Sequence, residues 1–271
     1  VTGRYDHVLF KVTDQLAGYK NSERSFGDFT PKAALNYKLS PNWSVYGSYG
    51  LSFDVPASNE MDDYTGQAHL NPDLKPQRSS NMEVGTKGSF VYPGKTYFSR
   101  VNFEATLFRS VIEDEIIPFD INGDVFYRNA AQTTRSGLEL GLTTAIVQGL
   151  TFGTSITYSD FSYDSYILRS ISGTGASSDV DYSGKEVPSV PKMNMSFSLA
   201  YNKLLSDNVI GFAKTQFQTV GKMYVNDQNN AETEGYSLLS LTLGAELFTG
   251  PFSFILSGGG MNLLDTEYVG F

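Results

Sequence analysis

The chain has 271 residues, a length that suits one large all-β domain or two ordinary domains. The absence of cysteine excludes disulfides, thiolate metal sites and cysteine nucleophiles, and the net charge of -9 argues against nucleic acid as a partner. Tyr, Phe and Gly, with 17, 19 and 26 residues, favour strands and turns over helices. No apolar run reaches about 18 residues, so a transmembrane helix is not expected.

Eleven strands are predicted in chain order, and their connections alternate between tight turns and long loops. The expected strands are 2–12, 28–39, 43–54, 77–91, 97–117, 124–146, 150–165, 191–204, 209–225, 236–248 and 252–262. Turn signals that contain Pro, Gly or Asn lie at 40–42, 93–95, 147–149, 205–208 and 249–251. The opposite ends are joined through 13–27, 55–76, 166–190 and 226–235, apart from a type I′ hairpin at Asn122-Gly123. Tight turns at one end and long loops at the other are typical of an outer-membrane barrel.

Within these strands, apolar and polar residues alternate with a period of two. In the segment LTFGTSITYSDFSY (150–163), the even-numbered residues from Leu150 to Tyr158 are mostly apolar and the intervening residues are small and polar. The same pattern recurs at 43–53, 103–107, 138–146, 195–201 and 239–247. Stripes of about nine to eleven residues match a tilted strand that crosses hydrocarbon, and Trp43, Tyr158 and Tyr201 suit the interfacial girdles. We therefore predict an all-β fold, a transmembrane antiparallel up-and-down β-barrel.

Three stretches resemble segments of the TonB-dependent outer-membrane receptors. NPDLKPQRSSNMEVGTKG (71–88) resembles their Asn-Pro-x-Leu-x-Pro…Glu-x-Gly-x-Lys segment, and YRNAAQTTRSGLELGL (127–142) resembles their Asn…Gly-x-Glu strand. NLLDTEYVGF (262–271) is similar to their Asn-Leu-Phe-Asp-x-x-Tyr segment, with Leu264 where Phe is usual. The resemblance extends over essentially the whole chain.

The resemblance implies a 22-stranded barrel filled by an N-terminal plug. On that reading, residues 1–271 form the C-terminal part of the barrel, from the eleventh to the twenty-first strand. The chain opens on Val1 in what reads as a strand, so we expect the plug, the TonB box and the first ten strands upstream. The closing strand is also expected outside the chain, because an open sheet leaves unpaired edges that hydrocarbon does not tolerate.

The implied function is active uptake of a scarce nutrient at the bacterial outer membrane, most often a ferric siderophore or another iron complex. The expected partners are TonB, the iron–siderophore ligand and outer-membrane lipid, and the receptor is expected to be a monomer without a cofactor. The alternatives are a passive porin, which would need no plug, and a TonB-dependent receptor for cobalamin or oligosaccharide. A soluble carbohydrate-binding sandwich would alternate too, but it explains neither the one-sided turns nor the strand lengths.

Three carboxylates are predicted on the lumen face by their parity, namely Glu83, Glu104 and Glu139, where Lys87 also falls. A pair of carboxylates could also suggest hydrolysis, because glycoside hydrolases use two carboxyl groups in catalysis. Polar side chains are nevertheless the rule on the wet wall of a barrel, so we interpret all three as structural. No nucleophile motif or phosphate loop is present, and we expect no catalytic residue and no enzyme.

The long loops carry the candidate ligand-binding residues, which are Tyr64, His69, Arg128 and Tyr166. Tyr and Arg are common anchors at recognition surfaces, and an Arg pairs well with an anionic ligand. The two histidines and the Glu113–Glu115 acidic run match no metal-site spacing, so no metal site is predicted.

Overall fold

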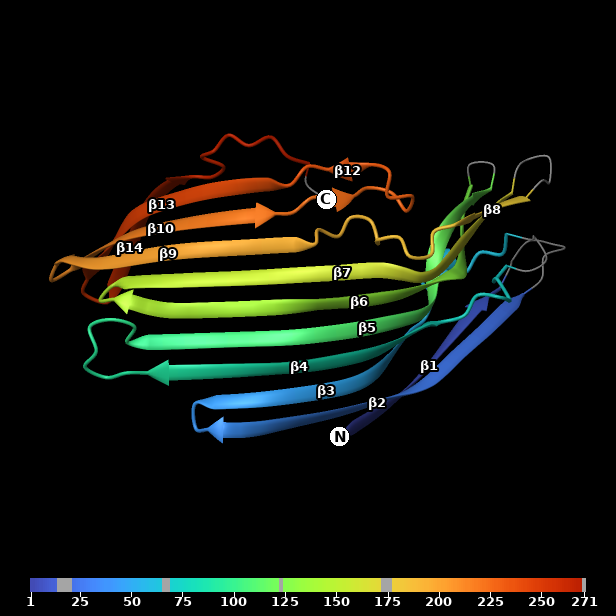
Figure 1. Cartoon of the computed structure of the whole chain (residues 1–271), viewed down its shortest axis with the longest axis horizontal. Coiled ribbons are helices and arrows are strands. Elements are labelled where there is room, and N and C mark those ends of the chain that lie inside the picture. Colours follow the sequence, from blue (N-terminus) through green and yellow to red (C-terminus); the bar gives the residue numbers. More distant parts are fainter. Residues whose placement is uncertain (14–20, 65–68, 122–123, 172–176, 270–271) are drawn as a thin grey trace.

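The structure is a computed structural model that describes residues 1–13, 21–64, 69–121, 124–171 and 177–269. Eleven strands follow one another in a single antiparallel meander. They are β1 (Thr2–Val12), β2 (Ser22–Ser40), β3 (Trp43–Asp54), β4 (Gln77–Val91), β5 (Arg100–Ile121), β6 (Asp124–Val147), β7 (Leu150–Ile171), β9 (Met193–Ser206), β10 (Val209–Val220), β13 (Tyr236–Thr249) and β14 (Phe252–Gly260). Figure 1 shows the strands side by side in a curved sheet, with short turns at the left and longer connections at the right. The predicted all-β meander is confirmed.

Short secondary-structure elements lie at the end of the sheet where the longer connections are. β8 (Ser177–Asp181) pairs with the outer end of β7, and β11 (Met223–Tyr224) pairs with β12 (Glu232–Thr233) in a separate hairpin. One short 3-10 turn, η1 (Ser58–Glu60), lies between β3 and β4. Within the described residues, no helix has the length and apolarity needed to cross a membrane.

The strand boundaries agree with the predictions at β1, β3 and β4 and differ elsewhere. β2 begins at Ser22 instead of 28, and β7 continues to Ile171 instead of 165. The extra part of β2 is polar and pairs only with β1, and the extra part of β7 pairs with β8 from Ile167 to Ile171. β5 begins at Arg100 rather than 97, because Phe98, with a φ of 52°, interrupts the extended chain.

Two further sequence predictions concern the loops. The expected strand 209–225 is wrong as a single element: β10 ends at Val220 and β11 starts after Gly221, whose N–H donates to the Met193 carbonyl at 2.7 Å. The Asn122-Gly123 hairpin lies outside the described residues, although the flanking ladder pairs Ile121 with Asp124.

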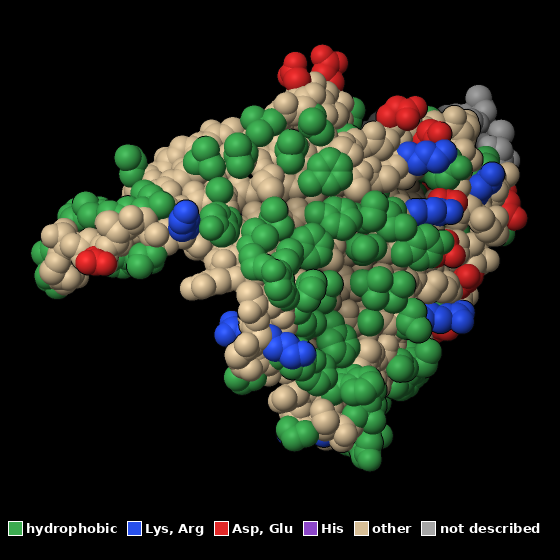
Figure 2. All heavy atoms as spheres, turned by 60° about the vertical axis from the view of Figure 1, so that its left-hand side comes forward, with side chains coloured by type: hydrophobic (Ala, Val, Ile, Leu, Met, Phe, Trp, Pro, Cys, Tyr) green, Lys and Arg blue, Asp and Glu red, His purple; other side chains and the backbone are tan. Residues whose placement is uncertain are grey.

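The cross-strand register aligns the apolar stripes into one continuous face. Leu107 lies opposite Val84 on β4 and Leu138 on β6, and the series continues through the later strands. Leu140 and Leu241 are each 38% exposed and Leu107 is 60% exposed, so none of the described residues forms a second layer over this face. Figure 2 shows the apolar side chains spread over the surface. The predicted two-faced wall is confirmed.

The opposite face combines polar side chains with glycine. Glu104 on β5 lies across Gly141 of β6, where an added Cβ would come within 2.8 Å of the Glu104 side chain. The Tyr46 ring covers Gly85 in the same manner, at 2.5 Å from the position of an added Cβ. Glycine thus lets longer neighbouring side chains lie flat along this wall.

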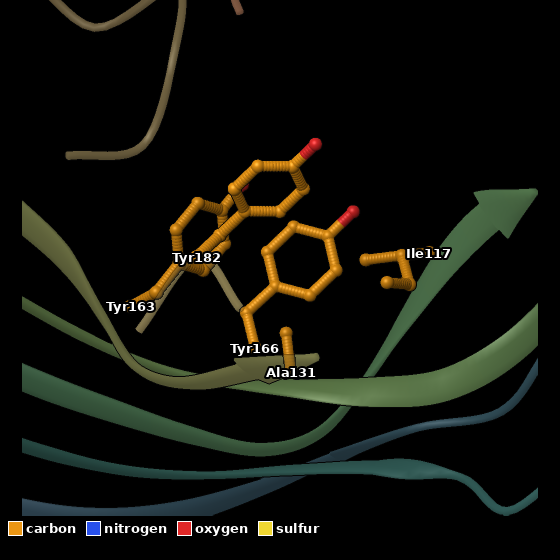
Figure 3. Packing of buried hydrophobic residues seen from close by; sticks show 5 residues of the cluster. All are labelled: Ile117, Ala131, Tyr163, Tyr166 and Tyr182. Atoms are coloured by element: carbon orange, nitrogen blue, oxygen red, sulfur yellow. The ribbon is translucent and has the colours of Figure 1, made fainter. Parts of the chain in front are cut away.

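Buried hydrophobic clusters occur at the outer end of the sheet, where the long connections are. The loop core comprises Phe26, Met61, Leu70 and Leu74. The tyrosine core comprises Ile117, Ala131, Tyr163, Tyr166 and Tyr182, shown in Figure 3.

Candidate ligand-binding site

The described parts of the connection 55–76, residues 55–64 and 69–76, pack on the sheet. Met61 and Leu74 are fully buried in the loop core, and the N–H of Asn71 donates to the Met61 carbonyl at 2.6 Å. Arg24 of β2 donates to the carbonyls of Asn71 and Leu74, the latter at 2.9 Å. The Asn-Pro-x-Leu segment quoted above therefore fixes this loop against β2.

Asn129 of β6 joins the same loop to the β5–β6 hairpin. Its side-chain oxygen accepts from the N–H of Lys75 at 2.7 Å, and its side-chain nitrogen donates to the carbonyl oxygens of Lys75 at 2.8 Å and Asp114 at 2.6 Å. The sequence analysis did not single out Asn129. Its position inside the 127–142 segment was the one available signal.

An aromatic group with one cation forms where this loop meets the β5–β6 hairpin. The Tyr64 ring lies edge-on to Phe119 at 5.2 Å and to Phe126 at 6.3 Å between centroids. The guanidinium of Arg128 lies 5.0 Å from the Phe119 ring centroid, within cation–π range. Tyr64 is 37% exposed. We call Tyr64, Phe119, Phe126 and Arg128 the outer aromatic group; it unites two of the four predicted ligand residues and adds two that sequence reasoning missed.

Tyr166 lies in the tyrosine core and is only 4% exposed. Its ring packs against Tyr163 at 4.7 Å and Tyr182 at 5.1 Å between centroids. The geometry favours a supporting position, because the Tyr166 side chain is sealed within this core. Its predicted contact with a ligand stays a prediction.

Asp227, on the connection between β10 and β13, closes the tyrosine core. The hydroxyl of Tyr163 donates to one Asp227 oxygen at 2.8 Å, and the hydroxyl of Tyr166 donates to the other at 3.5 Å. Burial, reinforced by the Asp227 charge, raises the pKa of both hydroxyls above the ordinary tyrosine value. Two hydrogen bonds between Asn229 and the backbone of Glu186 join this connection to the one between β8 and β9.

His69 is partly buried next to Leu70 of the loop core. The described residues include no group of three or more His, Asp or Glu side chains placed to hold a metal ion. A ligand role for His69 stays a prediction.

Glu83, Glu104 and Glu139 share the face opposite the apolar stripe. Together with Tyr46 and other residues they line an open depression of about 420 Å³. The Tyr46 hydroxyl lies 2.7 Å from the Thr106 hydroxyl in this depression. The predicted structural role of the three carboxylates stays a prediction.

Comparison with known proteins places these features in a family. The family described as TonB dependent receptor-like, beta-barrel matches residues 1–263. The chain is 38% identical over 88 residues to the Ferric-pyoverdine 358 receptor of Pseudomonas putida, which covers 32% of this chain and 10% of that receptor. It is 29% identical over 114 residues to the Catecholate siderophore receptor Fiu of Escherichia coli strain K12, with 41% of this chain and 14% of that receptor covered.

Solved structures show the same fold. The siderophore receptor PiuA from Acinetobacter baumannii superimposes with a TM-score of 0.73 at 21% identity over 98% of this chain and 36% of its own. BauA, the ferric preacinetobactin receptor of that organism, superimposes with a TM-score of 0.67 at 17% identity over 97% of this chain and 36% of its own. The chain thus spans about a third of these structures and a smaller part of the two sequence relatives. It belongs to the TonB-dependent receptor family, and its meander is part of an outer-membrane β-barrel.

Proposed function

We propose that the protein containing these residues imports a ferric siderophore through the outer membrane, with energy supplied through TonB. The observation that carries the proposal is the outer aromatic group, three rings and one guanidinium at the end of a lipid-facing barrel wall, in which Tyr64 is exposed and Phe119 is buried. Ring faces stack on aromatic ligand groups, and a guanidinium pairs with anionic oxygens. The sequence relatives named above, a ferric-pyoverdine receptor and a catecholate siderophore receptor, support this ligand class.

In this proposal, residues 1–271 supply the C-terminal part of the barrel wall and outer loops. A plug of about 150 residues, an ordinary domain size, and a TonB box lie upstream. A lumen wide enough for such a ligand would leak without a plug, so opening it must be coupled to an energy source. An iron complex arrives with its metal already liganded, and the loops need supply only polar and aromatic contacts. Tyr64, His69 and Arg128 are proposed to make them, with Tyr166 in a supporting position.

Growth under iron limitation tests the proposal. A strain that lacks the receptor gene is complemented with the complete receptor and fed individual ferric siderophores, with and without a functional TonB. We expect restored growth on one siderophore class, and only when TonB is functional. Growth without TonB would instead indicate a passive porin. Rescue only on cobalamin or an oligosaccharide would reassign the ligand.

Arg128→Gln in the same assay examines the outer aromatic group. Loss of a hydrogen bond to a charged group costs about 1.5–3 kcal/mol, so we expect roughly 10- to 100-fold weaker uptake affinity. Arg109→Gln is the matched control, because Arg109 is an exposed arginine on the outward face of β5. Equal affinity in the two variants would remove Arg128 from the binding site.

A further inference from the structure

The barrel wall contains a seam between β2 and β3. Their ladder runs only from the Ser40–Trp43 pair to the Lys32–Gly50 pair. Beyond it, residues 22–31 of β2 pair with β1 alone, and residues 51–54 of β3 pair with β4 alone. In Figure 1 the two strands lie side by side at the left and part toward the right. The seam therefore opens in the outer half of the wall.

A depression of about 430 Å³ lies along this seam. Its apolar lining is Phe29, Tyr49, Leu51 and Val111. Leu51 and Val111 lie on either side of Ser80 in the register, so both belong to the outward, lipid-facing side of the wall. Leu51 is 40% exposed. The depression is thus continuous with the face that contacts acyl chains in the outer membrane.

A polar border closes the outer end of the depression. It consists of Asp28, Arg78 and Glu113, which lies opposite Arg78 in the register, while Ser80 lies between Leu51 and Val111. Nε of Arg78 donates to Oδ2 of Asp28 at 2.6 Å across the seam. This bond uses one of the five guanidinium N–H groups, and the Arg78 side chain is 54% exposed. Asp28 therefore orients Arg78 and leaves most of its donors available to a second acceptor.

The position of this border relative to the apolar stripe suggests what occupies the depression. From the tight turn at Trp43, about eight residues of a tilted strand lead to Gly50, which brings the seam close to the end of an apolar band about 25 Å tall. Figure 2 shows the apolar surface giving way to Lys, Arg, Asp and Glu side chains toward the right. At this height the neighbours are the headgroups and first methylenes of lipids. A guanidinium is well suited to a phosphate there, because its fork donates to two oxygens at once.

We propose that the seam between β2 and β3 holds one acyl chain of a phosphorylated outer-leaflet lipid, with the lipid phosphate bound by Arg78. Phe29, Tyr49, Leu51 and Val111 contact the chain, and the lipid fills the gap that strand pairing leaves open. The inference depends on the outer-membrane location of the barrel and is independent of which nutrient the receptor imports.

Retention of lipid by the complete receptor tests this proposal. The receptor is reconstituted in phosphatidylcholine nanodiscs doped with bis-phosphorylated lipid A, released into mild detergent and analysed by native mass spectrometry. The wild-type protein should retain lipid A in preference to phosphatidylcholine. Leu51→Trp, which fills the depression, should lose the bound lipid, and Arg78→Gln should retain roughly tenfold less.

The two control variants make the same Leu→Trp and Arg→Gln changes at other positions on the lipid-facing side of the wall. Leu140→Trp changes a residue of similar exposure, 38% against 40%, on strand β6, and Arg109→Gln removes another exposed arginine. Both should retain lipid A as the wild type does. Heat-modifiable gel mobility verifies that each variant is folded, and Val111→Trp replaces Leu51→Trp if that variant does not fold.

The remaining outcomes overturn all or part of the assignment. Equal retention of lipid A by the seam variants and the controls would show that lipid A binds the barrel surface non-specifically. Equal retention of phosphatidylcholine and lipid A, unaffected by Arg78→Gln, would overturn the phosphate contact. Retention of a second receptor copy or of detergent alone would replace the lipid as the occupant.

Discussion

The wall of the barrel and its outer loops are stabilised in different ways. In the wall, backbone ladders join neighbouring strands, and large apolar side chains such as Leu107 and Leu243 stay more than half exposed within the protein. In the outer loops, Met61 and Leu74 are sealed from solvent, and side chains hydrogen-bond to the backbone of other loops. Lipid replaces the protein core in the first region. The second region is built like a small water-soluble domain.

This contrast follows from the solvent that each region meets. In hydrocarbon, backbone groups must be paired within the sheet, but apolar side chains need no protein partner. In water, a loop stays ordered only if it buries apolar surface or satisfies its backbone through side chains. Truncation of an apolar side chain should therefore cost more stability in the loops, and introduction of a charge should cost more on the lipid-facing side of the wall.

The largest effect is expected in the loop core. Met61→Ala and Leu74→Ala each remove a fully buried side chain, which costs about 2–5 kcal/mol. Hydrogen exchange should show faster opening of the connection 55–76 with the rest of the sheet protected. Leu107→Ala, at a 60% exposed position in the wall, should cost much less. A comparable loss of protection there would break the distinction between wall and loops.

A charge on the lipid-facing side should come next. Leu140→Arg places a cation on the apolar face and should reduce the free energy of unfolding by about 2–4 kcal/mol near the bilayer midplane. Ser155→Arg is the matched change, since Ser155 is exposed on the opposite face of β7. Urea unfolding in lipid vesicles measures both. If Ser155→Arg were the more damaging variant, the assignment of the two faces would be reversed.

Removal of the Asn129 side chain should weaken the attachment of the 55–76 loop by about 1–3 kcal/mol, because the Lys75 backbone loses both of its partners. Asn129→Asp keeps an acceptor for the Lys75 N–H and should lose less than Asn129→Ala. Hydrogen exchange at 69–77 gives the measurement. Identical exchange in wild type and Asn129→Ala would show that the loop core alone holds the loop.

The smallest effect concerns the ionisation of the tyrosine core, which lies at the outer ends of β5, β6 and β7 next to the long connections. The pKa of Tyr163 and of Tyr166 is raised in the folded state, so their stabilising contribution is complete below about pH 10, the ordinary tyrosine pKa, and is lost as pH rises toward the folded value. In a pH titration followed by tyrosinate absorbance, a late fraction of the tyrosines should therefore ionise only above the ordinary tyrosine pKa. This late fraction should disappear in the double variant Tyr163→Phe/Tyr166→Phe.

Asp227→Asn should move that late fraction to lower pH, because it removes the negative charge next to both hydroxyls. Asp207→Asn, in the tight turn between β9 and β10, should leave it in place. An unchanged late fraction in Asp227→Asn would mean that burial alone sets the ionisation.

Much of the wall could be predicted because its signals are local. β3 and β4 begin and end at the predicted residues, since a period of two and a turn residue such as Gly94 after β4, with φ of 77°, are properties of a few neighbouring positions. The outer extensions of β2 and β7 could not be predicted in that way. These segments become strands where β1 and β8 lie beside them.

The candidate site shows the same division. Tyr64 and Arg128 could be chosen from residue type and loop position, but their common neighbour Phe119 follows from packing. Asp227 reaches Tyr163 across 64 positions of sequence, and no periodic pattern reports such a pair.

The sequence by itself determined a two-faced antiparallel wall, its turns and its family, because alternation and turn chemistry act between adjacent residues. Only the tertiary structure decided which loops meet, which aromatic side chains are buried, and where β2 leaves β3 to open the seam. Those outcomes depend on contacts between segments that are distant in sequence, and such contacts form only when the whole curved sheet brings the segments together.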